Sequence, residues 1–202
     1  MSEPLGEPRG RTRWRRFLAF TVPALAAAGF VVFGMANGAI AASFAVSGQT
    51  FKVSADRLEG TGFVQYGGTV RDKSGATHPV AISGIASASL SNLCQSVKVP
   101  GAPIVLTINA GGGGKPATAS NLLLDLTELQ GDATFTNIEI GRDASTLDKG
   151  PSTGVAGSFG QQSDKIVIDD LRQVAWSTTA GTFSLNGLRL KVNVGADAKE
   201  CF

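Results

Sequence analysis

The stretch NGLRLKVNV, residues 186–194, decides the fold class of this chain. From Leu188 to Val194 every second residue is apolar, and the residues between them are Arg, Lys and Asn. Period two places one side of a β-strand on a core and the other side in water. The Asn-Gly pair before the run is a turn signal. We therefore expect a half-buried β-strand over 188–194.

The same alternation recurs along the rest of the chain. It is found at 51–56, 104–108 and 122–126. The 26 glycines follow no Gly-X-Y period, which excludes collagen, and with few aromatic residues they are typical of an all-β domain. A short helix over Leu122–Leu129 is the one local alternative.

A short motif of a polar residue, then Asn or Asp, then Leu or Ile is repeated in the chain. It occurs at Ser91-Asn92-Leu93, Ser120-Asn121-Leu122, Thr136-Asn137-Ile138 and Asp169-Asp170-Leu171, with Asn186-Gly187-Leu188 as a looser copy. Such echoes are typical of stacked β architectures. The sequence predicts a duplicated β unit and leaves open a sandwich, a β-helix or an open groove.

An uncharged apolar run precedes the β-rich part. FLAFTVPALAAAGFVVFGMA, residues 17–36, is long enough to cross a hydrocarbon core of about 30 Å as a helix. Residues 1–16 hold five arginines, and positive charge stays on the cytoplasmic side. We expect a basic cytoplasmic tail (1–16), a transmembrane signal anchor or signal peptide (17–42) and a β-rich extracytoplasmic domain (43–202).

The fate of the span leaves two locations open. Ala39-Ile40-Ala41 fits a signal-peptidase pattern, and cleavage after Ala41 would give a secreted protein. A retained anchor would give a single-pass protein of the cell membrane with its C-terminal domain outside. Gly34 and Gly38 form a small-xxx-small spacing, which lets anchor helices approach closely in a homo-oligomer.

The charge and the cysteine content of the chain limit the kinds of partner and metal site that we expect. Outside residues 1–16 the chain holds 13 of its 18 Lys and Arg and 14 of its 16 Asp and Glu. The β-rich domain therefore has no basic excess, and we predict no nucleic-acid partner. Cys94 and Cys201 are the only cysteines, and two thiols alone cannot complete a structural zinc site. In an oxidising compartment they predict a disulfide.

One hydrolase motif is matched in the sequence, but its surroundings differ from those that the motif requires. Ser152 lies in a G-x-S-x-G match, residues 150–154, but within a polar loop rather than at a strand-to-helix elbow. The only histidine, His78, precedes Ser152, which reverses the order of the α/β-hydrolase fold. Ser152 and His78 are thus weak esterase candidates, and the sequence favours a protein that is not an enzyme.

Metal and cofactor motifs are incomplete as well. The glycine run 111–114 is followed by Lys115 and then by Pro116, where a P-loop needs Ser or Thr. No D-x-D-x-D-G calcium loop is present. We predict no cofactor and no metal site.

Two segments lack apolar periodicity and predict exposed loops. They are Ala110–Thr118 and Gly141–Asp164. The second is long for a compact domain, so it is either functional or mobile. It is the first candidate for a contact surface.

Several segments carry a family resemblance. They are Gly34–Gly68, SNLCQSV (91–97), GDATFTNIEIGRDASTLD (131–148), QVAWSTTAGTFSLNGL (173–188) and KECF (199–202). Together they resemble an actinobacterial family of uncharacterised exported or membrane-anchored proteins, many of which carry the name cholesterol esterase. The resemblance implies one N-terminal hydrophobic span, one small outer domain and, through the inherited name, ester hydrolysis.

These observations favour a non-enzymatic, membrane-associated protein of the cell envelope. Long alternating strands with few acid–base groups suit a β domain that binds membrane lipid or another hydrophobic ligand. The structural alternative is self-assembly, or assembly with another envelope protein. The third hypothesis is a lipid ester hydrolase.

Overall fold

A computed structural model describes residues 47–195 and 198–202 of the chain. Its strands are β1 (Phe51–Arg71), β2 (Thr77–Ser91), β3 (Leu93–Lys98), β4 (Ile104–Ala110), β5 (Ala117–Thr136), β6 (Glu139–Asp143), β7 (Phe159–Thr179), β8 (Thr182–Ser184) and β9 (Arg189–Val194). One turn of 3-10 helix, Ala144–Thr146, is the only helical element of these residues. The all-β expectation is confirmed, and Leu122–Leu129 is strand rather than helix.

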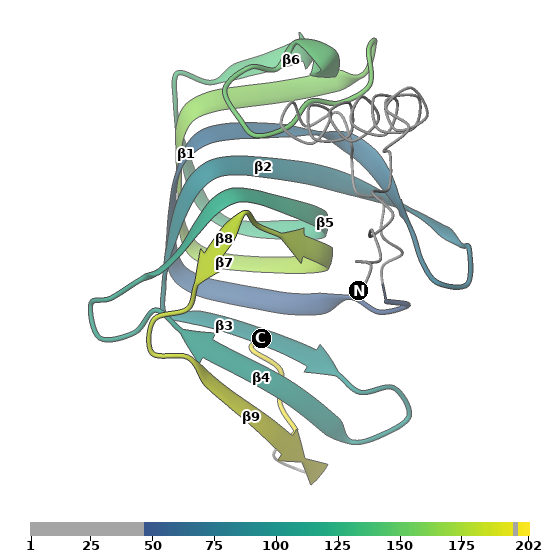
Figure 1. Ribbon diagram of the computed structural model, residues 1–202, viewed down its shortest axis with the longest axis vertical. Helices are drawn as coiled ribbons and strands as arrows, with labels where there is room; N and C mark the ends of the chain where they lie inside the picture. Colours follow the sequence, from purple (N-terminus) through teal and green to yellow (C-terminus); the bar gives the residue numbers. More distant parts are fainter. Residues whose placement is uncertain (1–46, 196–197) are drawn as a thin grey trace, which may run out of the picture. The chain divides into compact units, whose positions relative to one another are not determined.

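All strands belong to one antiparallel sheet that curls until it meets itself (Figure 1). β1 pairs with β2, β2 with β5, β5 with β7, and β7 again with β1. β5 closes this circuit because Ala117–Leu126 pairs with β2, whereas Leu123–Thr136 pairs with β7. The architecture is therefore a single closed-up sheet, neither a two-sheet sandwich nor a β-helix.

Three strands extend the sheet beyond the circuit. β3 pairs with the beginning of β1, where Lys52–Ser54 lies opposite Cys94–Ser96. β4 pairs with β3, and β9 pairs with β4 (Figure 1). Among the described residues β9 has no partner on its other side, so it is an edge strand.

Left-handed residues mark bends in the strands. Asn92, Asn121, Asn137 and Asp170 have φ angles from 47° to 54°. Asn and Asp tolerate this region better than most residues that carry a Cβ. They are the middle residues of the four repeated triplets, so the triplets mark bends rather than a duplicated unit.

The bends of neighbouring strands line up in two rows across the circuit. We call each row a crease: it is a level at which the residue-by-residue pairing of neighbouring strands skips one residue. In the first crease the pairing skips Asn121 of β5, Ala86 of β2, Gly62 of β1 and Asp164 of β7. Asn137 extends that row, since its Nδ2 donates to Asp164 Oδ2 at 2.6 Å. In the second crease the pairing skips Asp56 and Asp170, and Asn92 Nδ2 donates to Asp56 Oδ2 at 2.6 Å.

Each crease changes which residues of a strand face inward. The β1 side chains that belong to the core inside the circuit are Val53 and Ala55, then Leu58 after the second crease, then Phe63 after the first. The inward positions thus switch from odd to even numbers and back. This switch keeps one continuous apolar core inside the circuit, and the Phe63 ring lies 5.5 Å from that of Phe135 across it.

The long predicted loop Gly141–Asp164 is shorter and better packed than expected. Its ends belong to β6 and β7, which leaves residues 144–158 between the two strands. Ala144 and Leu147 of this segment are buried against the outer face of β1. The segment is therefore held on the sheet by these two side chains.

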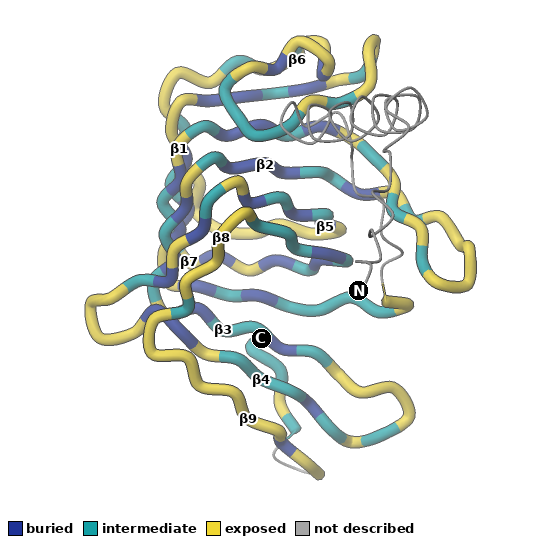
Figure 2. The backbone as a smooth tube through the Cα atoms, in the orientation of Figure 1, coloured by how far each residue is buried: buried dark blue, intermediate teal, exposed yellow. Residues whose placement is uncertain are grey.

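β9 forms where the alternation predicts, but with its burial reversed. Leu190, Val192 and Val194 are 58%, 57% and 60% exposed, whereas Asn193 is only 8% exposed. The physical reason is that residues 198–202 pack on the Asn193 side of the β3–β4–β9 sheet. Figure 2 shows the exposed course of β9 beside the buried positions of the circuit.

The chain divides into two compact units, residues 1–43 and 44–202. The second unit contains all the strands given above, the core and both cysteines, so we expect it to fold without the first. The predicted span 17–42, with Gly34, Gly38 and Ala41, lies outside the described residues. None of the described residues forms a helix with the length and apolar character of a membrane span.

Candidate functional site

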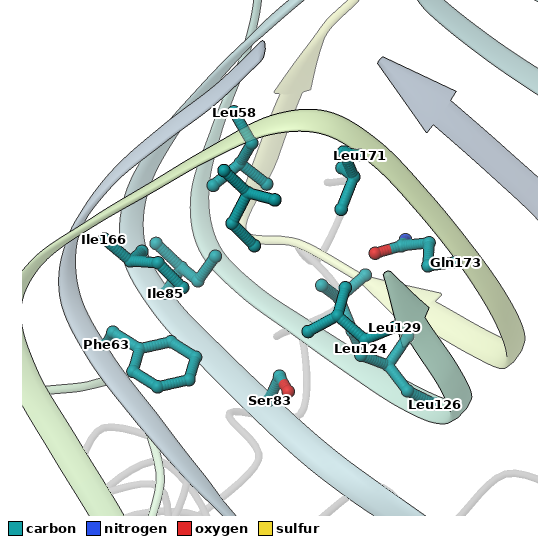
Figure 3. Close-up of a pocket in the computed structure, with 11 residues that line it drawn as sticks. Leu58, Phe63, Ser83, Ile85, Leu124, Leu126, Leu129, Ile166, Leu171 and Gln173 are labelled. Atoms are coloured by element: carbon teal, nitrogen blue, oxygen red, sulfur yellow. The ribbon is translucent and has the colours of Figure 1, made fainter. Parts of the chain in front are cut away.

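The interior of the circuit holds a narrow apolar pocket (Figure 3). Nine of its eleven lining residues are Leu, Ile or Phe, contributed by β1, β2, β5 and β7. The other two are Ser83 and Gln173. Side chains approach one another so closely that the free space holds about one water molecule. A larger ligand therefore needs the pocket to widen.

Gln173 is the unusual member of this lining. It is only 3% exposed and is the only amide among the lining residues. Figure 3 shows the amide among the leucines of the pocket. It lies opposite Leu129 in the pairing of β5 with β7. Its amide gives an otherwise apolar lining a group that can both donate and accept hydrogen bonds.

Ser83, in contrast, has its partner. Gln65 Nε2 donates to Ser83 Oγ at 2.8 Å, and Gln161 Nε2 donates to Gln65 Oε1 at 2.6 Å. This row of three side chains makes one wall of the interior polar. Gln173 is thus the second polar residue of the lining.

Leu129 is where the pocket meets solvent. It is 38% exposed, whereas the other ten lining residues are all buried. It lies in the part of β5 that pairs only with β7. Rotation of this one side chain would open the pocket without breaking a strand pair.

Ser152 does not have the surroundings of a nucleophile. Its Oγ is buried and has no hydrogen-bond partner in the described part of the chain. The hydroxyl lies against β2, so that a Cβ added at Gly84 would stand 3.1 Å from it. His78 lies six residues before Gly84 on β2, and six residues of a strand span about 20 Å. The structure therefore does not bring Ser152 and His78 together.

His78 has its own partners at the beginning of β2. Its Nε2 lies 3.0 Å from Asp72 Oδ2, and its ring stacks on Trp176 with centroids 4.1 Å apart. Hydrogen bonds from Ser74 and from His78 hold the pKa of Asp72 well below its usual range. These contacts tie the β1–β2 turn to β7.

Acidic side chains accept hydrogen bonds from backbone N–H groups or form ion pairs with neighbouring basic residues. Asp143 accepts hydrogen bonds from the backbone N–H groups of Ser145 and Gly157, which lowers its pKa. Asp169 pairs with Arg57 at 2.7 Å. Within the described ranges, no three His, Cys, Asp or Glu side chains gather as metal ligands do.

The predicted disulfide joins Cys94 to Cys201, with an S–S distance of 2.03 Å. It holds residues 198–202 on β3, where Cys201 N donates to Ser96 Oγ at 3.0 Å. Glu200 accepts from Lys98 at 2.9 Å and from Lys52 at 3.3 Å. One face of the β3–β4–β9 sheet is thereby covered.

Sequence reasoning missed the pocket and its amide. Gln173 was visible only as one polar residue before the apolar pair Val174-Ala175. Its inward direction depends on the crease at Asp170, which shifts the alternation along β7. The triplet Asp169-Asp170-Leu171 was the available signal, had it been interpreted as a bend.

Comparison with known proteins adds a family. No curated protein and no solved structure matches the chain. A family profile covers residues 47–202, which include every strand, the pocket and the disulfide. The chain therefore belongs to the family of unknown function DUF6230.

Proposed function

We propose that this protein is a non-enzymatic protein of the cell envelope that binds an amphiphilic ligand inside the circuit of β1, β2, β5 and β7. The ligand is apolar over most of its length and carries one polar group that pairs with the Gln173 amide. A membrane lipid or a lipid-derived molecule has this chemistry. The predicted N-terminal span, residues 17–42, would keep the domain close to such ligands.

The observation that carries this proposal is the apolar lining of the pocket, in which Gln173 is the only amide. Apolar pockets with a few well-placed polar groups are the usual form of small-molecule sites. An amide can donate a hydrogen bond to a carbonyl or hydroxyl group of a ligand and accept one from its hydroxyl group. The apolar walls then supply affinity, and Gln173 sets the orientation of the ligand.

The first test is the intact mass of the full chain, purified natively from membranes and measured before and after denaturation. We expect an additional mass of one amphiphile that is lost on denaturation. Gln173→Leu should retain at least tenfold less of it, because one hydrogen bond of about 1.4 kcal/mol corresponds to a factor of ten.

Gln130→Leu is the matched control, since it makes the same amide-to-leucine exchange at an exposed position of β5. This variant should keep the wild-type amount of ligand. Equal retention by both variants would remove Gln173 from the site. A wild-type protein without bound mass in repeated preparations would overturn the proposal itself.

A further inference from the structure

The β3–β4–β9 sheet has an apolar face that is half-buried on β3 and β4 and exposed on β9 among the described residues. Alternation and register place these side chains on one side: Val97 of β3, Ile104, Leu106 and Ile108 of β4, and Leu190, Val192 and Val194 of β9. We call this set the wing face. Its β9 members are 57–60% exposed (Figure 2). Contiguous exposed apolar patches of this kind mark interaction surfaces.

The opposite side of the same sheet already has its cover. Cys94 and Ser96 point to that side and hold residues 198–202 through the disulfide and a hydrogen bond. Residues 198–202 therefore cannot also cover the wing face. The wing face stays available to a partner outside this unit.

The charges around the wing face are mainly positive. Within 93–110 and 185–202 the basic residues are Lys98, Arg189, Lys191 and Lys199, and the acidic ones are Asp197 and Glu200. Glu200 is neutralised by its pairs with Lys52 and Lys98. Arg189 and Lys191 alternate with the apolar residues of β9 and therefore point to the other side of the sheet. Because β9 is an edge strand, their charges still stand within about one Debye length, ~10 Å, of a surface that touches the wing face.

We propose that the wing face docks on the surface of an anionic lipid bilayer. Its aliphatic side chains enter the boundary of headgroups and acyl chains, while Arg189 and Lys191 attract anionic headgroups. The inference shares the membrane location with the proposed function, but it does not depend on the pocket. It assigns the bilayer itself as a partner of the folded domain, in addition to the predicted anchor.

A second copy of the chain fits the same face less well. In the register that is centred on Leu190, antiparallel pairing of two β9 edges would place Arg189 of one copy opposite Lys191 of the other. Like charges directly opposite each other destabilise a sheet, and charged edge strands resist such pairing. Self-association is accordingly an outcome that the test must be able to detect.

The test uses residues 44–202, which form a compact unit of their own. Folding is checked by circular dichroism and by the absence of free thiols. The protein is floated with phosphatidylcholine vesicles that either contain or lack phosphatidylglycerol. We expect flotation with the anionic vesicles, loss of it at high salt, and at least a tenfold weaker binding of Leu190→Gln/Val192→Gln.

Ile140→Gln/Val155→Gln is the matched control, because these two apolar residues are 66% and 76% exposed at other places of the same unit. It should bind as the wild type does. No binding of the wild type to anionic vesicles would overturn the proposal, and so would equal binding of the two double variants. A dimer in sedimentation that Leu190→Gln/Val192→Gln dissociates would assign the face to a second copy instead.

Measuring both variants in both assays tests whether the pocket and the wing face act independently. Gln173→Leu should float with anionic vesicles as the wild type does, whereas Leu190→Gln/Val192→Gln should keep the ligand of the pocket. Loss of both activities in either variant would contradict the independence of the two sites.

Discussion

Asn121 holds a left-handed backbone, with φ of 47°, in the middle of β5. Strand residues on either side of it continue their pairing with β2, at Ser120 and at Leu122. A residue with a Cβ is strained in this conformation, and Asn tolerates it better than most. The bend of β5 at the first crease therefore depends on the residue type at this position.

Replacement of Asn121 tests this dependence. We expect Asn121→Ala to lower the free energy of unfolding by about 1–2 kcal/mol, the cost of a left-handed alanine. Asn121→Gly should stay within about 0.5 kcal/mol of the wild type, since glycine enters this region without a steric cost. Urea unfolding at constant m value measures both.

Asn109→Ala is the control for the loss of an exposed amide in a strand, because Asn109 is exposed in β4 and is not left-handed. It should change the stability only slightly. If Asn121→Ala were as stable as Asn109→Ala, the strain at the crease would be refuted.

The triplets show how far single residues could be interpreted from sequence. Their Asn and Asp were recognised as a repeat, and each one is left-handed in the structure. Periodicity alone did not distinguish a bend within a strand from a turn between strands, since both use Asn and Asp. As a result the bends were expected to separate repeated units.

At the scale of elements, segment 144–158 is fastened to the sheet by charge and by one buried amide. Glu139 accepts from Arg142 at 2.6 Å and from Lys149 at 3.2 Å. Gln162 is fully buried, and its Oε1 accepts the backbone N–H groups of Asp148 and Lys149 at 2.9 and 3.2 Å. Packing and polar contacts thus hold this segment together.

We expect low pH to weaken the contacts of Glu139 that hold segment 144–158 on the sheet. Arg142, Gln162 and Lys149 lower the pKa of Glu139 to about 2. A carboxylate with a lowered pKa stabilises the folded state above its unfolded pKa of about 4.3 and loses that contribution as the pH falls toward 2. We expect Glu139→Gln to be less stable than the wild type near neutral pH and to show a smaller loss between these two values.

Urea midpoints measured over that pH range test the expectation, together with proteolysis within 144–158. Asp132→Asn is the control, because Asp132 is exposed on β5 and forms no ion pair among the described residues. Parallel acid curves for the wild type and Glu139→Gln would contradict the assigned role of Glu139.

The strands themselves were the most predictable elements. The alternating runs 51–56, 104–108, 122–126 and 188–194 lie in β1, β4, β5 and β9. Alternation does not say which of its two sides is covered, so β9 was expected with the wrong side in the core. The full 21-residue lengths of β1 and β7 were also hidden, because each crease shifts the alternation by one residue.

At the scale of the whole molecule, the disulfide fastens residues 198–202 to a strand more than one hundred positions earlier. The two cysteines are separated by 107 residues. The Phe202 ring lies under Lys52 at 4.9 Å, so the fastened segment also contacts β1. Closing a loop of this length removes much of the freedom of the unfolded chain.

Cys94→Ser/Cys201→Ser should lower the free energy of unfolding by up to about 4–5 kcal/mol, the upper figure of the loop-entropy estimate. Thermal and urea unfolding of the double variant measure the loss. Reduced wild-type protein is the internal comparison and should match the variant. An unchanged stability would show that the noncovalent contacts of Glu200 and Phe202 suffice.

The circuit and its pocket were not accessible from the sequence. Both depend on β1 pairing with β7, whose residues lie about one hundred positions apart, and periodicity contains no information on such partners. Residues such as Gln173 therefore acquire a role only when the circuit is closed. The same limit applies to the wing face, which is exposed because residues 198–202 occupy the other side.

The pairing of β1 with β7 also has a consequence in time. During synthesis β1 emerges first, and its partner Phe159–Thr179 emerges only after most of the chain has been made. Until then β1 has β2 on one side and a bare edge on the other, which is the arrangement that invites pairing with neighbouring chains. We therefore expect the chain to be most prone to aggregation before β7 has been synthesised. A chaperone that shields the edge of β1 would act during this period.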